Sequence, residues 1–401
     1  PLPFFDFTIV GAGASGLWLA FALYEQGLLE KKRLCVAESD SAKQNDRTWC
    51  YWADSPLLPI GMVSKAWSSV RNPGNPALRD SLSPYTYYHV RSADFYANIK
   101  QHLKDCANIT WFTAVVMGLE EQDDQVLVQT THGAWLSNQV FTSALPPQDE
   151  RSMAASTTAL RGFSGYRKSD PRSLFLWQSF VGWRIQTTEP VFDDTCATMM
   201  RFDIAQHGNT QFMYELPFSA TEALVEMTRF GEHRLTVREA ETVLREYLSK
   251  KGTQYRIIEE ETGAIPMTPQ FDMRRKHLSA RTRVVYIGLP GGAIKPTTGY
   301  GFKRMQAYGN AVAIAIKAHQ PLPTMHRPWR FRLYDHLLLR ILLQHPHRGK
   351  TIFERLFETQ PIPLVLRFLD EETTVWEEAV IFSRLPLRLF LGNLIRHCIH
   401  R

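Results

Sequence analysis

Cysteine is scarce in this chain of 401 residues, and its spacing supports neither a disulfide framework nor a metal site. The cysteines are odd in number and irregularly spaced, and no two have metal-ligand spacing: they are Cys35, Cys50, Cys106, Cys196 and Cys398. We therefore expect reduced thiols, a cytoplasmic protein and no bound metal.

Long hydrophobic runs are also missing. The first apolar stretch, residues 4–23, contains Asp6, has no basic segment before it and is interrupted by three glycines, so it does not resemble a signal peptide. No other stretch reaches the roughly 18 apolar residues that a membrane-spanning helix requires. The chain shows no internal repeat and no recognised nucleic-acid-binding motif, so we predict no transmembrane helix and no nucleic-acid partner.

Acidic residues are sparse in two segments near the C-terminus of a chain whose net charge is +6. Residues 326–350 contain six basic residues and one acid, and residues 384–401 contain four arginines and no acid. Both segments interleave the charges with apolar side chains, a pattern that favours an anionic membrane surface as partner. Plain C-terminal helices with solvated faces are the alternative interpretation.

The order of the expected elements predicts an α/β fold. A buried strand at residues 5–10, a helix from Ser15 to about Gly27 and a strand at residues 33–37 form a βαβ opening. A helix from Ser92 to about Lys104 and further strands follow. The length of the chain favours two packed domains.

Residues 156–265 have a different character, because short strands dominate there and one helix is announced by a capping box of Thr236 and Glu239. A buried strand then returns at residues 284–288. We therefore predict a discontinuous Rossmann-like FAD-binding domain formed by residues 1–155 and 266–320. An antiparallel-sheet substrate domain occupies residues 156–265, and a helical, basic portion that faces the membrane occupies residues 321–401.

The best-defined motif lies between the first strand and the first helix. In the stretch Gly11-Ala12-Gly13-Ala14-Ser15-Gly16, the glycines allow a tight turn, a close approach of the backbone to a pyrophosphate and close packing of the helix on the strand. The helix N-terminus favours the negative charge. Glu38 follows at the distance expected for a carboxylate that binds the ribose hydroxyls. The position of the motif at the start of the chain favours FAD over NAD.

A second glycine-rich loop follows the strand at residues 284–288. Gly288, Pro296, Thr297, Gly299 and Gly301 fit a backbone that passes close to a flat ring. In flavoproteins that resemble aromatic hydroxylases, a Gly-Asp pair contacts the ribityl chain at this point. Here Leu289 replaces the Asp. A glycine-rich turn without a ligand is the alternative.

Glu226 interrupts an apolar, strand-like run at residues 223–228. Alternation along a strand places Glu226 on the same face as Leu224 and Thr228. If that face is buried, desolvation raises the pKa of the carboxyl and makes it a proton donor near neutral pH. If the face is wet, Glu226 is an ordinary surface residue.

Taken together, these motifs resemble the bacterial, flavin-dependent type of lycopene β-cyclase. The stretches that carry the resemblance are residues 11–16, 45–52, 182–185, 214–228, 263–267 and 288–302. Residues 224–228 match the acidic motif of the family, although Glu226 is the single acid there where plant members have two.

The resemblance implies a fold shared with aromatic hydroxylases and geranylgeranyl reductases. It also implies cyclisation of the ends of lycopene and related linear carotenoids, without net redox, by a protein bound peripherally to the inner membrane. Glu226 would be the general acid, reduced FAD the cofactor and NAD(P)H its reductant. The resemblance places Arg91 near the cofactor. Trp49, Tyr51 and Trp52 would stabilise a cation at the substrate, with ordinary core packing as the alternative.

Other interpretations stay open at this point. Residues 368–373, Phe-Leu-Asp-Glu-Glu-Thr, also resemble the plant acidic motif, but we expect them to be the solvated first turn of a helix. A flavin monooxygenase or prenyl-chain reductase of the same fold is the rival enzyme. A non-catalytic lipid-binding escort protein is the rival of another class. The oligomeric state and the number of substrate ends that react are not predicted.

Overall fold

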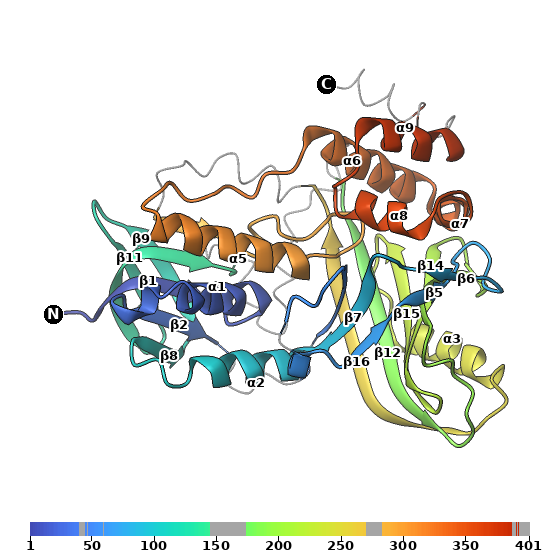
Figure 1. The fold of residues 1–401 in the computed structure, drawn as a ribbon, viewed down its shortest axis with the longest axis horizontal. Helices are drawn as coiled ribbons and strands as arrows, with labels where there is room; N and C mark the ends of the chain where they lie inside the picture. The colour runs from blue at the N-terminus through green and yellow to red at the C-terminus, as the bar shows by residue number, and fades with distance from the viewer. Residues whose placement is uncertain are drawn as a thin grey trace.

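The computed structural model describes residues 1–39, 45, 47–58, 60–144, 174–269, 283–386, 390 and 392. Within these residues, two large sheets, one small sheet and a group of C-terminal helices build the molecule (Figure 1). The predicted boundary between residues 155 and 156 lies outside the described residues, as does most of the basic segment 384–401.

The first sheet has the order β8-β2-β1-β11-β10-β9, with β17 also paired to β11. Its strands are β1 (Phe4–Val10), β2 (Leu34–Glu38), β8 (Ile109–Thr113), β9 (Val116–Glu121), β10 (Val126–Thr130), β11 (Gly133–Thr142) and β17 (Val284–Tyr286). The pairs β1–β2, β2–β8, β1–β11 and β11–β17 are parallel. Because β17 returns to this sheet after the strands of the second sheet, the first sheet is built from two segments that are far apart in the chain.

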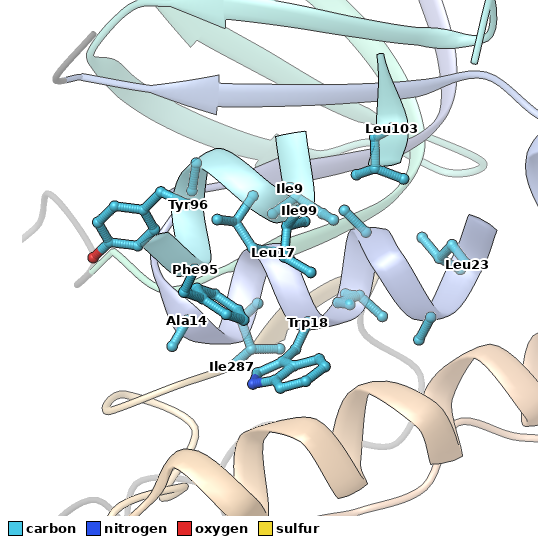
Figure 2. Close-up of a cluster of buried hydrophobic side chains, with 14 of the residues drawn as sticks. Ile9, Ala14, Leu17, Trp18, Leu23, Phe95, Tyr96, Ile99, Leu103 and Ile287 are labelled. Carbon is cyan, nitrogen blue, oxygen red and sulfur yellow. The ribbon is translucent and has the colours of Figure 1, made fainter. Parts of the chain in front are cut away.

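Three helices cover one face of the first sheet: α1 (Ala14–Glu25), α2 (Ser92–Leu103) and α5 (Phe302–Lys317). Figure 2 shows Trp18 of α1 between α5 and Phe95 of α2. The Trp18 ring centroid lies 5.3 Å from that of Phe95 and 5.6 Å from that of Phe302. Their burial fixes the position of α5, and thereby of the glycine-rich loop that precedes it.

The second sheet has the order β16-β12-β15-β14-β13-β5-β6. Its strands are β5 (Ser69–Arg71), β6 (Arg79–Ser81), β12 (Leu176–Thr187), β13 (Ala197–Arg201), β14 (Thr210–Ser219), β15 (Glu222–Gly231) and β16 (Tyr255–Met267). Helix α3 (Val237–Ser249) packs on one face, with the predicted capping box of Thr236 and Glu239 present. The pairs among β12, β14, β15 and β16 are antiparallel.

The structure departs from the sequence prediction in two places. Strands β5 and β6, from the N-terminal segment, extend the second sheet, and β16 continues to Met267. Strand β11 begins at Gly133, and its first half pairs with β10 and its second half with β1 and β17. These pairings join segments far apart in sequence, so local patterns do not reveal them.

The small sheet and the C-terminal helices complete the fold. The small sheet has the order β3 (Thr48–Ala53), β7 (Thr86–Arg91) and β4 (Lys65–Trp67). Helices α6 (Trp329–Gln344), α7 (Gly349–Thr359), α8 (Ile362–Leu369) and α9 (Val375–Arg384) gather near one end of the second sheet (Figure 1). Short 3-10 turns occur at Leu28–Glu30, Ile60–Met62 and Pro346–Arg348. Among the helices of the described residues, none has the length and apolar character to cross a membrane.

Candidate active site

Four strands of the second sheet each contribute one residue to a row that crosses the sheet. In the antiparallel register, Tyr214 lies opposite Glu226, Glu226 opposite Gly182, and Gly182 opposite Glu261. Directly opposed residues in antiparallel strands point to the same face. The alternate residues of these strands pack against α3, so the row points to the other face, toward β3 and β7.

Gly182 is the reason that two glutamates can approach each other in this row. A Cβ atom at Gly182 would lie 3.2 Å from the Glu226 Cβ, and 3.1 Å from the Glu261 Cγ. Because glycine leaves this space open, the carboxyl groups of Glu226 and Glu261 approach each other across β12 closely enough for a hydrogen bond. A carboxyl–carboxyl hydrogen bond requires a proton on one of the two groups.

The surroundings of Glu226 favour its protonated form. Burial raises the pKa of Glu226 well above its usual range, and the negative charge and hydrogen bond of Glu261 raise it further. Burial also raises the pKa of Glu261, but the hydrogen bond from Thr48 Oγ1 to Glu261 Oε2, at 2.6 Å, acts in the opposite direction. The proton therefore belongs to Glu226, which also accepts a hydrogen bond of 3.0 Å from Thr228.

Phenol and thiol groups lie beside the row of Tyr214, Glu226, Gly182 and Glu261, which we call the acid row. The Tyr87 and Tyr300 hydroxyl oxygens lie 3.4 Å apart, Tyr214 hydrogen-bonds to Tyr300, and Cys50 hydrogen-bonds to Tyr87. Burial raises the pKa of Tyr300 and of Cys50 to about 12 each, so both groups stay neutral at physiological pH. Tyr300 belongs to the second glycine-rich loop and connects this loop with the acid row.

Two cavities flank the acid row along β3, whose residues Thr48, Cys50 and Trp52 point to the same side. The first cavity borders the glycine-rich loop and is lined by Cys50, Trp52, Tyr300 and the start of α5. The second cavity is lined on one side by residues 259–261 and on the other by Thr48, His89 and Arg91, with Phe218 and Leu224 adding apolar surface. Glu261 therefore borders a different cavity from the phenol groups.

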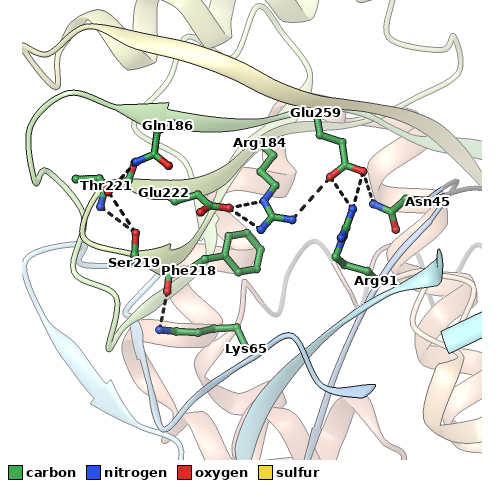
Figure 3. A network of polar contacts seen from close by, with 10 residues as sticks. All are labelled: Asn45, Lys65, Arg91, Arg184, Gln186, Phe218, Ser219, Thr221, Glu222 and Glu259. Carbon is green, nitrogen blue, oxygen red and sulfur yellow. Dashed lines mark hydrogen bonds and ion pairs between the residues drawn. The ribbon is translucent and has the colours of Figure 1, made fainter. Parts of the chain in front are cut away.

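Arg91 lies at the end of β7 and binds Glu259 of β16 through two contacts of 3.2 Å. Figure 3 shows that Asn45 and Arg184 reach the same carboxylate, and that Arg184 also contacts Glu222. In the described residues, Arg91 is thus placed against the second sheet. Its predicted contact with the cofactor stays a prediction.

The first glycine motif has the geometry that the sequence predicted. Gly11 has a φ of +96°, and a Cβ atom at Gly16 would lie 2.0 Å from the Gly11 carbonyl oxygen. Glu38, at the end of β2, accepts a hydrogen bond of 2.8 Å from the Ala12 backbone N–H. Gly13 is the N-cap residue of α1, and no side chain caps this helix N-terminus. The N-terminus of α1 can therefore receive an anion.

The second glycine-rich loop, residues 288–301, lies against both the first motif and the second sheet. A Cβ atom at Gly288 would lie 3.0 Å from Ser15 Oγ, and one at Gly299 would lie 2.9 Å from Gln178 Oε1. Ser15 Oγ and Gln178 Oε1 are buried, and neither has a hydrogen-bond partner among the described residues. Buried polar atoms are normally hydrogen-bonded, so these two atoms are candidates for contact with a bound cofactor.

The loop is anchored on its other side by the C-terminal helices. Thr297 Oγ1 donates a 2.6 Å hydrogen bond to Asp335 of α6. Lys295, which directly precedes Pro296, has its Nζ 3.2 Å from the Asp335 carboxylate. Gly301 is the N-cap residue of α5. The proposed ring-facing residues are thus fixed between α5 and α6.

The three predicted substrate aromatics separate onto two faces of β3. Trp49 and Tyr51 stack on Phe302 with ring centroids 5.0 and 5.7 Å apart, inside the core around α1. Trp52 points to the opposite side, where its ring lies 4.7 Å from Tyr300. The structure therefore brings Trp52, but not Trp49 or Tyr51, to the side of the acid row.

The expectation of a solvated acidic turn at residues 368–373 is wrong for Asp370 and Glu371. Glu371 is buried and ion-paired with Lys295, Arg304 and Arg327. These cations hold the pKa of Glu371 at about 2, so it stays ionised near neutral pH. The first turn of α9 begins later, after its N-cap residue Thr374, which forms a capping box with Glu377.

Reasoning from the sequence missed Glu261, Tyr214, Tyr87 and Tyr300 as members of the site. Gly182 belonged to a recognised stretch, but its function as a spacer between two carboxyls was not predicted. The available signal was the run of three glutamates at residues 259–261, because residues two apart in a strand, such as Glu259 and Glu261, share a face. Their pairing with Glu226 depends on strand register, which the sequence does not show.

Comparison with known proteins identifies relatives over nearly the whole chain. The profile of the family described as "Lycopene cyclase protein" matches residues 6–392. A lycopene beta-cyclase from Pseudescherichia vulneris is 27% identical over 403 residues, which cover 95% of this chain and 94% of that protein.

Solved structures share the predicted fold class. A geranylgeranyl bacteriochlorophyll reductase-like protein from Thermoplasma acidophilum has a TM-score of 0.57 at 11% identity, covering 98% of this chain and 99% of the other. A Klebsiella pneumoniae HpxO variant in complex with FAD has a TM-score of 0.50 at 14% identity, covering 97% of both chains. These similarities confirm the predicted fold class.

Proposed function

Because the chain belongs to the lycopene cyclase protein family, we propose that it closes the linear ends of lycopene and related carotenoids to β-ionone rings, without net redox. The observation that carries this proposal is the desolvated Glu226, which shares a hydrogen bond with a second carboxyl across Gly182. Such a carboxyl retains its proton near neutral pH, and cyclisation requires a proton donor rather than a hydride donor.

Glu226 is the proposed general acid. Its proton adds to the terminal double bond of the substrate and produces a tertiary cation. The neighbouring double bond attacks this cation and closes the ring, and loss of a ring proton then sets the β-type double bond. Protons and electrons balance over the whole reaction, so it is an isomerisation.

Aromatic side chains beside Glu226 suit a cationic intermediate. Trp52, Tyr87, Tyr214 and Tyr300 present neutral rings on the same side as the acid row, and aromatic faces attract cations. The dense packing of these rings also excludes water, which would otherwise quench the cation. Trp49 and Tyr51 pack on the core side of β3, behind these rings. We therefore propose that they contribute to substrate binding only indirectly, by supporting the rings.

The residues present fit FAD, because the anion-binding N-terminus of α1 and the unpartnered Ser15 Oγ and Gln178 Oε1 lie along the two glycine-rich segments. We assign the pyrophosphate to residues 11–16 and the ribose to Glu38. The proposed ring-facing residues are Gly288, Pro296, Thr297, Gly299 and Gly301, with Arg91 retained as a further cofactor residue. When bound in its reduced form, FAD supplies negative charge near the cation, and NAD(P)H is the proposed reductant.

Peripheral binding to the inner membrane is proposed through the first turns of α6 and α9. The pair Arg330–Glu378, at 2.9 Å, holds these turns together, and beside it Trp329 is 69% exposed and Trp376 is 78% exposed. Arg330 and the buried Arg327 are both ion-paired within the protein, so the basic segment 326–350 offers less free charge than its sequence implies. Exposed Trp side chains favour the membrane interface.

The test of this function is anaerobic incubation of the holoprotein with lycopene in vesicles, using chemically reduced flavin and no nicotinamide. The proposal predicts β-ring products, and repeated turnover without further reductant. Stoichiometric consumption of NAD(P)H with a reduced or oxygenated product would instead identify a prenyl-chain reductase or a flavin monooxygenase. Flavin-free protein without turnover would identify an escort protein.

A further inference from the structure

Glu261 is the unexplained member of the acid row. The general acid needs only one carboxyl, yet the fold places a second one beside it and reserves the space by having glycine at position 182. Glu261 Oε1 is buried and receives no hydrogen bond from an N–H or hydroxyl group of the described residues. The proton of Glu226 is therefore the group available to satisfy this oxygen.

We infer that Glu261 is a positioning residue for the acid proton: the two carboxyls share one proton across Gly182, and Glu261 connects the pair to the second cavity, beside β16. This inference deepens the proposed function and rests on Glu226 as the acid. The proton that leaves the closed ring returns to the pair, which therefore ends each turnover with the number of protons it began with.

The arrangement of β16 supports this connection. Glu259 and Glu261 are two residues apart and share a face of the strand. Glu259 is held by Asn45, Arg91 and Arg184 (Figure 3), so its charge is compensated. Glu261 lies next to this network, borders the same cavity and receives the Thr48 hydrogen bond. One end of the pair thus faces the aromatic side, and the other faces polar groups.

The other groups around the pair have fixed charge near neutral pH. From β7, β14, β3 and the glycine-rich loop, the titratable neighbours are Tyr87, Tyr214, Cys50 and Tyr300, and burial raises the pKa of each. Burial and nearby arginines lower the pKa of His89 to about 3. Arg91 and Arg184 are ion-paired with Glu259 beside the pair, and the charge of Arg47 acts on Glu261. The pair itself is therefore the group that titrates.

The experiment is the pH profile of cyclisation by the holoprotein in lycopene vesicles with reduced flavin. Cyclisation by the parent falls as the pH rises through the pKa of the pair, because the reactive form of Glu226 is protonated. Glu261→Gln removes the neighbouring negative charge, so the midpoint moves to lower pH by about one unit or more. At a pH above both midpoints, each pH unit by which the midpoint of Glu261→Gln is lowered makes its cyclisation about tenfold slower than that of the parent.

A second variant gives the opposite shift. Thr48→Val removes the hydrogen bond that stabilises the charged form of Glu261, so the proton lies on Glu226 less often and the pair loses its last proton at higher pH. We expect a lower maximal rate and a higher midpoint. The control is Glu120→Gln, an exposed residue of β9, which should leave the profile unchanged.

Unchanged midpoints in Glu261→Gln would overturn the inference, even if the rate fell at every pH, because loss of packing alone does not shift a titration. If Glu261→Gln does not fold, an unchanged midpoint in Thr48→Val overturns it. Glu226→Gln distinguishes this failure from failure of the proposed function. If Glu226→Gln is inactive while Glu261→Gln and Thr48→Val keep the parental midpoint, Glu226 is still the acid and only the inference of a shared proton fails.

Discussion

Glu226 and Glu371 are both glutamates withdrawn from water, yet the fold gives them opposite partners. Glu226 faces Glu261 across a glycine, and burial together with this like charge raises its pKa. Glu371 faces Lys295, Arg304 and Arg327, and these cations lower its pKa to about 2 despite its burial. Burial alone therefore does not make an acid; the neighbouring charge decides whether the carboxyl keeps a proton or a charge.

The two clusters are connected by residues 288–301. Tyr300 reaches the acid row, whereas Lys295 and Thr297 bind the charged cluster around Asp335. The charged cluster thus anchors the loop that we assign to the cofactor, and the acid row supplies the chemistry. The same residue type performs a structural function in one cluster and a proposed chemical function in the other.

The largest expected effect comes from removing the proton donor. Glu226→Gln keeps the shape of the side chain but cannot release an acidic proton, so we expect β-ring formation to fall by about 10²–10⁴-fold with retained fold and FAD content. The matched control is Glu372→Gln, next to Glu371 but 53% exposed, which should keep near-parental activity. Product analysis in lycopene vesicles measures both; near-parental cyclisation by Glu226→Gln would show that another group is the acid.

The second effect concerns stability and should appear in the other cluster. Glu371→Gln leaves the buried cations Lys295 and Arg327 to share the single carboxylate of Asp335, and breaking a buried ion pair costs about 3–5 kcal/mol. Urea unfolding near neutral pH should show this loss for Glu371→Gln and not for Glu372→Gln. A Glu371→Gln protein as stable as the parent would contradict a structural function of this cluster.

The third effect is a difference in how the two glutamates couple stability to pH. The raised pKa of Glu226 means that the parent loses stability as the pH rises from the usual 4.5 through the pKa in the folded state. Glu226→Gln avoids this loss, so its free energy of unfolding should rise relative to that of the parent by about 1.4 kcal/mol per pH unit across that interval.

The lowered pKa of Glu371 makes stability depend on pH in the opposite direction. Its contribution is present above the usual 4.5 and is lost as the pH falls toward about 2. Unfolding measured as a function of pH for both variants therefore tests the comparison directly. Parallel pH profiles for Glu226→Gln and the parent would contradict a raised pKa of Glu226.

The smallest effect should come from the exposed face beside the charged cluster. Trp376→Ser removes an exposed aromatic side chain at the start of α9, and we expect vesicle binding to weaken by about threefold to tenfold without a change in the pH profile of cyclisation. Vesicle sedimentation measures this change. Exposed Val237 on α3, far from α9 in Figure 1, provides the control variant Val237→Ser, and equal binding by both variants would exclude α9 as the contact surface.

Local patterns predicted the parts of the molecule that depend on local chemistry. The tight turn and close helix packing of the glycine motif at residues 11–16 and the capping box of Thr236 and Glu239 are short-range features, and the structure contains both. The strand that carries Glu226 was also recognisable, because the apolar run at residues 223–228 is visible within six residues.

The remainder of the site depends on contacts between distant segments. Glu261 meets Glu226 only through the register of two strands on either side of β12. Glu371 lies in a stretch whose sequence favours a solvated turn, and it is buried because three cations from other segments surround it. The division of Trp49, Tyr51 and Trp52 between two faces of β3 likewise depends on what each face meets.

The central claim is that Glu226 carries a proton at neutral pH whereas Glu371 does not. Infrared difference spectra of the holoprotein, parent minus Glu226→Gln and parent minus Glu371→Gln, report the two groups separately. We predict the carbonyl band of a protonated carboxylic acid for Glu226 at neutral pH, and carboxylate bands for Glu371. A carboxylate signal from Glu226 at neutral pH would contradict the account.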